Sequence, residues 1–222
     1  LKQRQCAEFI CRKIYTYFVN PNIDASHLDE LTDLFYKDYN IKKLMRHLFM
    51  SDWFYNENNI GAKIKSPVEL MVGIHKIVPS VFRKQRQVTY LQKMMGQILL
   101  YPVNVSGWKG DRYWIDSNSL MFRLKLPSVL LNNANISLNS KGEFEDDFSD
   151  FYNQKNQNFK VSDQARTYFE THYSKITKKE LKAVLVLPKL DQDTKEMLKI
   201  YQNQNAYQYC IQLMSIPEYQ LC

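Results

Sequence analysis

Apolar side chains recur at intervals of three and four residues along most of this chain, and this spacing constrains its fold more than any other feature. The first example is the segment 3–19, in which charged side chains lie mostly opposite the apolar ones. Such an arrangement is typical of an amphipathic helix with one buried face. The predicted apolar face consists of Cys6, Phe9, Ile10, Ile14 and Phe18.

Capping signals divide the chain into further helices. In the segment 66–69, Ser-Pro-Val-Glu, the serine and glutamate side chains can bind early backbone N–H groups, and proline suits the first helical position. The segment 177–180 predicts a second capping box, while Ser26 and Asn40 predict simple caps. Helices are therefore expected to begin at or near residues 3, 26, 40, 66, 85, 117 or 119, 162, 177, 191 and 204.

The helix that follows Ser66 is apolar nearly all round its axis, which predicts a buried central helix. Gly73 lies in its middle, where glycine costs about 1 kcal/mol relative to alanine. A neighbouring backbone that approaches closely would explain this glycine.

Composition agrees with a helical protein that has a real core. Of the 222 residues, 45% are hydrophobic and 14% aromatic, which a disordered chain would not reach. Six glycines and seven prolines are few for a turn-dense β-sandwich. The longest purely apolar run, 183–187, is far too short for a membrane span.

We therefore predict an all-α fold, a bundle-like single domain over residues 1–222, which we expect to be a C-terminal fragment of a larger protein. Residues 135–161 change character, with an acidic stretch and a Gln/Asn-rich patch, and they predict an irregular insertion. A small β-hairpin around the turn 140–142 is the alternative within that insertion.

The segment from Tyr101 to Arg123 is the principal candidate for a functional site. It lies between two helical patterns and concentrates two of the three tryptophans within seven residues. Trp108 and Trp114 could form an aromatic platform for a sugar ring or another flat group. The candidate ligand-binding residues are Asn104, Trp108, Asp111, Arg112, Trp114, Asp116 and Arg123.

The favoured interpretation of this segment is structural. A long loop must satisfy its backbone groups, and two indoles can pin it across the central helix. Arg123 would then neutralise an aspartate or bind loop carbonyls. Asp111 and Asp116 as an acid/base pair form a weaker alternative. Lys65 and Ser66 as a nucleophilic pair are also weaker, since capping explains that serine better.

Other chemistry is sparse. The four cysteines show no CxxC pattern and are expected to be buried or terminal thiols, and the four histidines show no metal-ligand spacing. We predict no cofactor and no metal site. The net charge is +7, of which residues 1–134 carry +8 and residues 135–222 carry −1. No block of five like charges occurs. The basic groups 42–46 and 83–86 therefore do not favour nucleic-acid binding over a solvated surface.

Six segments in consistent order resemble the C-terminal part of the bacterial Domain of Unknown Function 1800 family. The resemblance covers most of the chain except about 132–202, and Val103 departs from the family pattern, in which a second proline follows Pro102. The segments are AEFICRKIYTYFVNP (7–21), SDWFY (51–55), KIKSPVELMVG (63–73), MGQILLYPVNVSGW (95–108), WIDSNSLMFRLKLP (114–127) and IPEYQ (216–220).

The resemblance implies a large bacterial protein, often exported and often encoded beside a sulfatase-like companion. No activity defines the family, so it supplies no catalytic residue. We expect a non-catalytic binding or scaffold region whose partners are the N-terminal part of the parent chain and a carbohydrate or protein. The alternative is part of a hydrolase-like enzyme whose site is completed by the missing N-terminal part, with a half-pocket lined by Asp111, Arg112 or Arg123.

Overall fold

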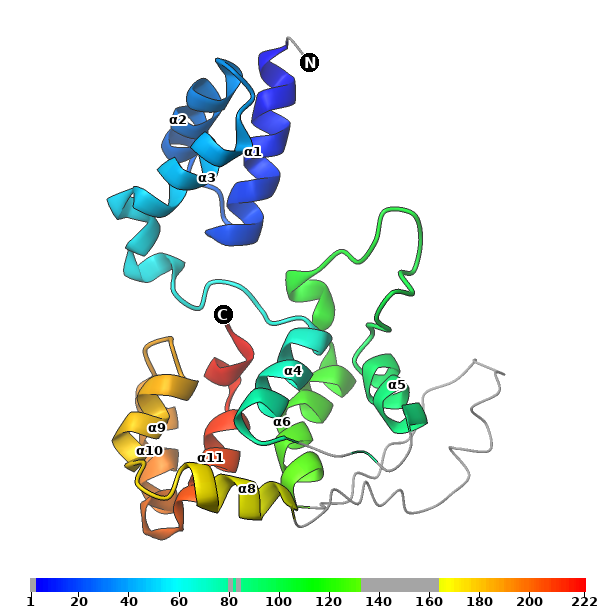
Figure 1. Cartoon of the computed structure of the whole chain (residues 1–222), viewed down its shortest axis with the longest axis vertical. Helices are drawn as coiled ribbons and strands as arrows, with labels where there is room; N and C mark the ends of the chain where they lie inside the picture. Colours follow the sequence, from blue (N-terminus) through cyan, green and yellow to red (C-terminus); the bar gives the residue numbers. More distant parts are fainter. Residues whose placement is uncertain (1–2, 80–81, 83–84, 133–163) are drawn as a thin grey trace. The chain divides into compact units, whose positions relative to one another are not determined.

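The computed structural model describes residues 3–79, 82, 85–132 and 164–222. The chain divides into two compact units (Figure 1). Unit 1 comprises residues 1–64 together with 221–222, and unit 2 comprises residues 65–220. Each unit has its own hydrophobic core, so each is described by itself.

Unit 1 is a group of three α-helices followed by two short 3-10 helices. Its elements are α1 (Arg4–Phe18), α2 (Ala25–Tyr36), α3 (Ile41–Met50), η1 (Asp52–Tyr55) and η2 (Glu57–Asn59). The core combines leucines of α2 and α3 with Phe35, and Trp53 and Phe54 of η1 pack against it, as the sequence predicted.

The buried face of α1 differs from the predicted one. Ala7, Cys11 and Tyr15 are buried, whereas Phe9 and Phe18 are exposed. Among the rings of α1, Tyr15 therefore lies in the core, and Phe9 and Phe18 lie outside it. The helical spacing was thus predicted correctly, and the buried face only in part, since Ile10 and Ile14 pack against the core as expected.

Caps in unit 1 were predicted with partial success. Asn40 caps α3 by accepting a hydrogen bond from the Lys43 N–H (3.1 Å), as expected. The cap of α2 is Asp24 and not Ser26, because the Asp24 carboxylate accepts from the N–H groups of Ser26 (2.9 Å) and His27 (3.1 Å). Aspartate and serine are both good caps, and the residue that adopts extended backbone geometry takes the role.

Unit 2 contains the other helices of the described residues. Its elements are α4 (Pro67–Ile77), α5 (Gln85–Met94), η3 (Asp111–Trp114), α6 (Ser117–Asn132), α8 (Gln164–His172), α9 (Lys178–Leu185), α10 (Gln192–Ile200), η4 (Tyr201–Asn203), α11 (Ala206–Met214) and η5 (Pro217–Gln220). Both predicted capping boxes are present, at the starts of α4 and α9.

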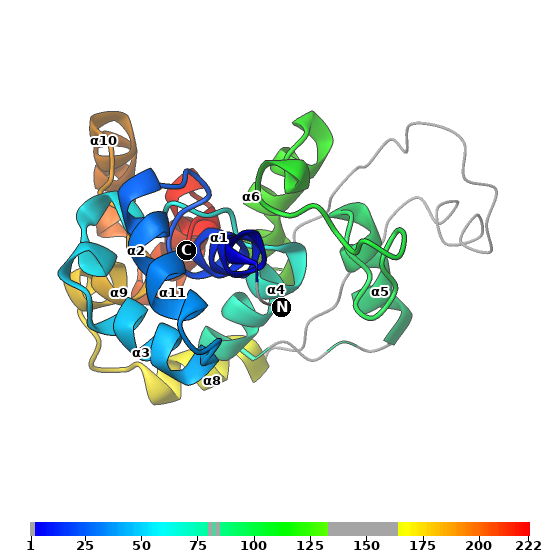
Figure 2. The same ribbon diagram turned by 90° about the horizontal axis from the view of Figure 1, so that it is seen from above.

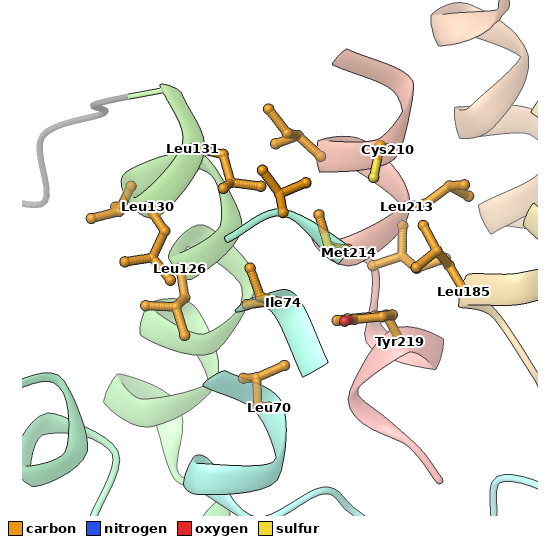
Figure 3. Close-up of a cluster of buried hydrophobic side chains, with 14 of the residues drawn as sticks. Leu70, Ile74, Leu126, Leu130, Leu131, Leu185, Cys210, Leu213, Met214 and Tyr219 are labelled. Carbon is orange, nitrogen blue, oxygen red and sulfur yellow. The ribbon is translucent and has the colours of Figure 1, made fainter. Parts of the chain in front are cut away.

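The core of unit 2 lies among α4, α6, α9 and α11 (Figure 3). Leu70 and Ile74 of α4 lie between the leucines of α6 and the side chains of α11. Both residues are completely buried, but Val72 on the other side of α4 is 45% exposed. The predicted central helix is therefore buried on the face that packs against α6 and α11, and not all round.

The predicted all-α fold is confirmed. Across the described ranges, β-structure is limited to two isolated bridges, one of which pairs Ile64 with Leu221 within unit 1. In the same ranges no helix has the length and apolar character to cross a bilayer. The chain divides into two compact units, and the expected single domain over residues 1–222 stays a prediction. The insertion predicted at 135–161 lies entirely outside the described residues.

Gly73 is explained by a close neighbour, although not by a backbone. A Cβ atom at this position would lie 3.3 Å from the hydroxyl oxygen of Tyr219. That distance is tighter than most contacts of real Cβ atoms. The glycine on α4 therefore leaves room for the buried tyrosine of η5.

This contact predicts that the effect of Gly73→Ala depends on Tyr219. Alanine should add up to about 1 kcal/mol of helix stability in the Tyr219→Phe background, where the hydroxyl is absent. In the unmodified protein crowding should cancel much of that gain. Urea unfolding of the two single variants and the double variant measures the coupling, and strictly additive effects would contradict the proposed crowding.

Candidate functional site

The segment between α5 and α6, residues 95–116, is here called the α5–α6 loop. Figures 1 and 2 show it in green, leaving α5 and returning to the start of α6. Its first residues are held by side-chain amides. The buried Gln97 accepts a hydrogen bond from the Val68 N–H of α4 (3.0 Å), and Gln92 accepts one from the Leu99 N–H (2.8 Å). The loop therefore starts from a fixed point on α4 and α5.

The middle of the loop is shaped by local turns. The Tyr101 N–H donates to the Ile98 carbonyl (2.9 Å), and Leu100 between them has a φ of +66°. A left-handed backbone is uncommon for leucine and costs of order 1–3 kcal/mol. Asn104 then forms a second turn, in which its side-chain oxygen accepts from the Ser106 N–H (2.8 Å). These contacts give the loop a defined conformation.

The loop tip, residues 99–106, is apolar and exposed. Leu100 is 89% exposed and Val105 fully exposed, and no charged residue occurs between Lys93 and Lys109. The exposed large apolar side chains of the tip are Leu99, Leu100, Tyr101, Val103 and Val105. Apolar side chains held in water give no hydrophobic stabilisation, and patches of this kind often mark interaction surfaces.

The other end of the loop is anchored at α6. Trp114 is buried, and its carbonyl accepts a hydrogen bond from the Ser119 hydroxyl (3.0 Å). Asp116 is the cap of α6, because its carboxylate accepts from the N–H groups of Asn118 and Ser119 (both 2.8 Å). The sequence had predicted Ser117 or Ser119 as the cap. Ser119 instead completes the contact from the other side, accepting from the Asp116 N–H (2.8 Å).

The predicted site residues are distributed over different environments. Asn104 and Arg112 are exposed, Trp108 is half-buried, and Trp114 is buried. The two indoles therefore do not form an exposed aromatic platform. Loop residues 99–106 also project into solvent and do not fold across α4, contrary to the sequence-based expectation.

The two aspartates of the loop have separate surroundings. Asp111 is half-buried with a φ of +48°, following Gly110 at +76°. Asp116 is exposed and uses its carboxylate as the α6 cap.

The candidate pair Lys65 and Ser66 has structural contacts. The Lys65 ammonium donates to the Tyr219 carbonyl (2.6 Å), and the Ser66 hydroxyl accepts from the Glu69 N–H (3.2 Å).

Arg123 is completely buried in unit 2. Its Nη2 donates to the Lys65 carbonyl (2.5 Å), and its Nε donates to the side-chain oxygen of Gln220 (3.1 Å). Burial lowers the pKa of the guanidinium to about 10, against the opposing attraction of Glu69. The sequence had predicted an aspartate or carbonyls of the α5–α6 loop as its partners, whereas the carbonyl that it binds belongs to Lys65, just before α4.

Unit 1 contains a polar and aromatic cluster that sequence reasoning missed. The Glu30 carboxylate contacts His47 Nε2 (2.5 Å) and accepts from Trp53 Nε1 (3.2 Å). His27 stacks on the Trp53 ring at 4.2 Å between ring centroids, and its Nδ1 lies 3.4 Å from the Tyr15 hydroxyl. These residues lie far apart in the sequence, and no spacing pattern connects them.

Neither region assembles a recognisable catalytic set. Among the described residues, no three His, Cys, Asp or Glu side chains are grouped to hold a metal ion. Burial raises the pKa of the Cys11 thiol to about 11 and that of Cys210 to about 12. Both thiols therefore stay protonated at neutral pH and are poor nucleophiles. The expected buried or terminal thiols are confirmed for Cys11, Cys210 and Cys222.

The comparisons with known proteins identify a family. The chain belongs to the family described as protein of unknown function (DUF1800), whose model matches residues 1–221. This confirms the resemblance seen in the sequence. Comparison with curated proteins gives no match, and comparison with solved structures gives none either.

The loop geometry predicts unequal effects for its anchor and its tip. Trp114→Ala should lower the free energy of unfolding by about 3–5 kcal/mol, because a buried indole is lost. Val105→Ser should change it by less than about 0.5 kcal/mol, because the side chain is already in water. Thermal and urea unfolding of both variants test the difference, and comparable losses would show that the tip is also packed.

The contacts of Arg123 predict that its loss destabilises unit 2. Arg123→Met removes the hydrogen bonds to the Lys65 carbonyl and to the Gln220 side chain, at about 1–3 kcal/mol for a buried group that loses its partner. Removing a desolvated charge offsets part of this, so we expect a net loss of about 2 kcal/mol. Arg112→Met, at an exposed arginine, is the matched control in urea unfolding. A variant at position 123 that equals or exceeds this control in stability would contradict the prediction.

Proposed function

We propose that this member of the DUF1800 family is a non-catalytic binding or scaffold region, and that the α5–α6 loop inserts its apolar tip into a groove on a partner protein. The observation that supports this most directly is the run of exposed apolar side chains from Leu99 to Val105 on an ordered loop. Burying such side chains in a partner is favourable at about 25 cal/mol per Å² of apolar surface.

The conformation of the loop favours binding as well as its composition. Gln97 and Trp114 fix its two ends, and the turns at Leu100 and Asn104 fix its course. A loop that already holds its bound shape loses less conformational entropy on association. The strained backbone of Leu100 fits this role, because strain of this kind concentrates at functional sites.

A protein partner fits the surroundings of the tip better than a lipid surface or a sugar. Segments that bind anionic membranes usually carry four to eight clustered Lys/Arg residues. The residues 93–116 carry three basic and two acidic side chains, a net charge of +1. A sugar platform would need an open ring face, and the indole of Trp114 is buried.

The alternative function is part of a hydrolase-like enzyme completed by a missing N-terminal part. This alternative predicts a half-pocket lined by Asp111, Arg112 or Arg123. The burial of Arg123 and its contacts with Lys65 and Gln220 lend this alternative no support. A bacterial origin and export of the parent protein remain expectations from the family resemblance.

The proposal is tested with a photoreactive amino acid at Val105 in the full-length protein, in cells that express it. Val184 on α9, which is 62% exposed, is the matched control position. We expect a discrete protein adduct from position 105 and not from position 184. With the purified partner, Leu100→Ser should weaken binding by about tenfold, as for the central residue of an interface.

Three results would contradict the proposal. The first is an adduct with lipid alone at position 105. The second is labelling of equal strength at both positions. The third is an affinity that Leu100→Ser does not change.

A further inference from the structure

Unit 1 carries a continuous series of aromatic contacts on its surface. Neighbouring ring centroids lie 4.7–5.8 Å apart, and the rings come from the ends of α1 and α3 and from η1. This aromatic row consists, in order of contact, of Tyr17, Phe18, Phe49, Phe54 and Tyr55. It is separate from the α5–α6 loop, and the inference drawn from it does not depend on the function proposed above.

The row is exposed and has a ridged shape. Tyr17 is 59% exposed and Tyr55 66% exposed, while only Phe54 of the row packs against the core of unit 1. Interplanar angles between neighbours are 76–90°, so exposed ring faces alternate with ring edges. The rings of the row therefore do not form one flat platform.

The two ends of the row are fixed in place. The Tyr55 hydroxyl donates to the Phe49 carbonyl (2.8 Å), which holds this ring against α3. The Lys63 ammonium lies 4.1 Å from the centre of the Tyr17 ring. Ring positions that are set before binding lower the entropy lost when a ligand arrives.

Unit 1 also has an acidic depression, two of whose lining residues are next to row residues in the sequence. It contains Met50, which follows Phe49, and Trp53, which precedes Phe54. The depression is open to solvent and is lined by Glu30, His47, Met50, Ser51, Asp52 and Trp53. The carboxylate of Glu30 is engaged by His47 and Trp53, whereas the exposed Asp52 forms no ion pair within the described residues.

We propose that this surface binds a proline-rich peptide segment that carries a basic residue beside its prolines. A polyproline II helix has three residues per turn and no internal hydrogen bonds, and proteins recognise it through aromatic-lined grooves. The exposed rings of the row provide an aromatic surface on which such a helix can lie. The arginine or lysine of the peptide meets Asp52 in the depression, which gives charge complementarity and sets the direction of the peptide.

The ring geometry disfavours a carbohydrate at this surface. A sugar ring stacks on an open aromatic face, and the faces of neighbouring rings in the row are nearly perpendicular. Two or more sugar units in a chain would therefore meet edges as often as faces.

Fluorescence anisotropy with the full chain and labelled synthetic peptides tests the proposal. The main probe is a ten-residue peptide of proline and leucine with one terminal arginine, and two comparison peptides replace the prolines by glycine or the arginine by glutamine. We expect binding of the main probe, and a loss of about tenfold in affinity for Tyr17→Ala and for Tyr55→Ala. Phe9→Ala is the control, because Phe9 is a similarly exposed ring of α1 outside the row.

The charge of the depression is tested separately. Asp52→Asn should weaken binding of the arginine peptide by about threefold at low salt and leave the glutamine peptide unaffected. Far-UV circular dichroism and the melting temperature of each variant establish that it is folded. The proposal fails if no proline-rich peptide binds at millimolar concentration, if the glycine peptide binds equally well, or if Phe9→Ala weakens binding as much as Tyr55→Ala. It also fails if an oligosaccharide binds to the row and the peptide does not.

Discussion

The buried guanidinium of Arg123 is the contact on which the arrangement of unit 2 depends. It joins α6 to the Lys65 carbonyl and to the side chain of Gln220. The backbone N–H of Lys65 donates in turn to the Gln220 carbonyl (2.8 Å). Lys65 and Gln220 are the first and last residues of unit 2, so one cation in α6 holds both ends of the unit. A buried charge is expensive, and its hydrogen bonds to two acceptors offset that expense.

The same helix supports the candidate binding loop. Asp116 and Ser119 at the start of α6 bind each other, and Ser119 also holds the carbonyl of the buried Trp114. Arg123 lies about one turn beyond Ser119 on α6 and ties this helix to α4 through Lys65, the residue before the α4 cap. The apolar tip is thus presented from a rigid base, which is the condition under which an exposed loop can recognise a partner at low entropic expense.

Local features of this fold were predictable from the sequence, and long-range polar contacts were not. Helical periodicity and the capping boxes at Ser66 and Thr177 depend on residues at most four apart, so the sequence alone identifies them. The partner of Arg123 lies 58 positions away at Lys65, and Glu30 meets His47 and Trp53 across 17 and 23 positions. Which polar groups meet at that separation depends on how the helices pack, and no spacing rule encodes it.

The failure at α1 is informative about function. Periodicity predicted that Phe18 faces the core, yet Ala7, Cys11 and Tyr15 occupy the core and the ring of Phe18 joins the aromatic row. A helix that buries alanine and cysteine while exposing phenylalanine forgoes hydrophobic stabilisation worth about 1.5–3 kcal/mol for each fully buried large side chain. Departures from local consistency are expected at functional surfaces. The exposed rings of unit 1 and the exposed tip of the α5–α6 loop in unit 2 are both departures of this kind, which is why we assign binding to them and not to Trp108 and Trp114.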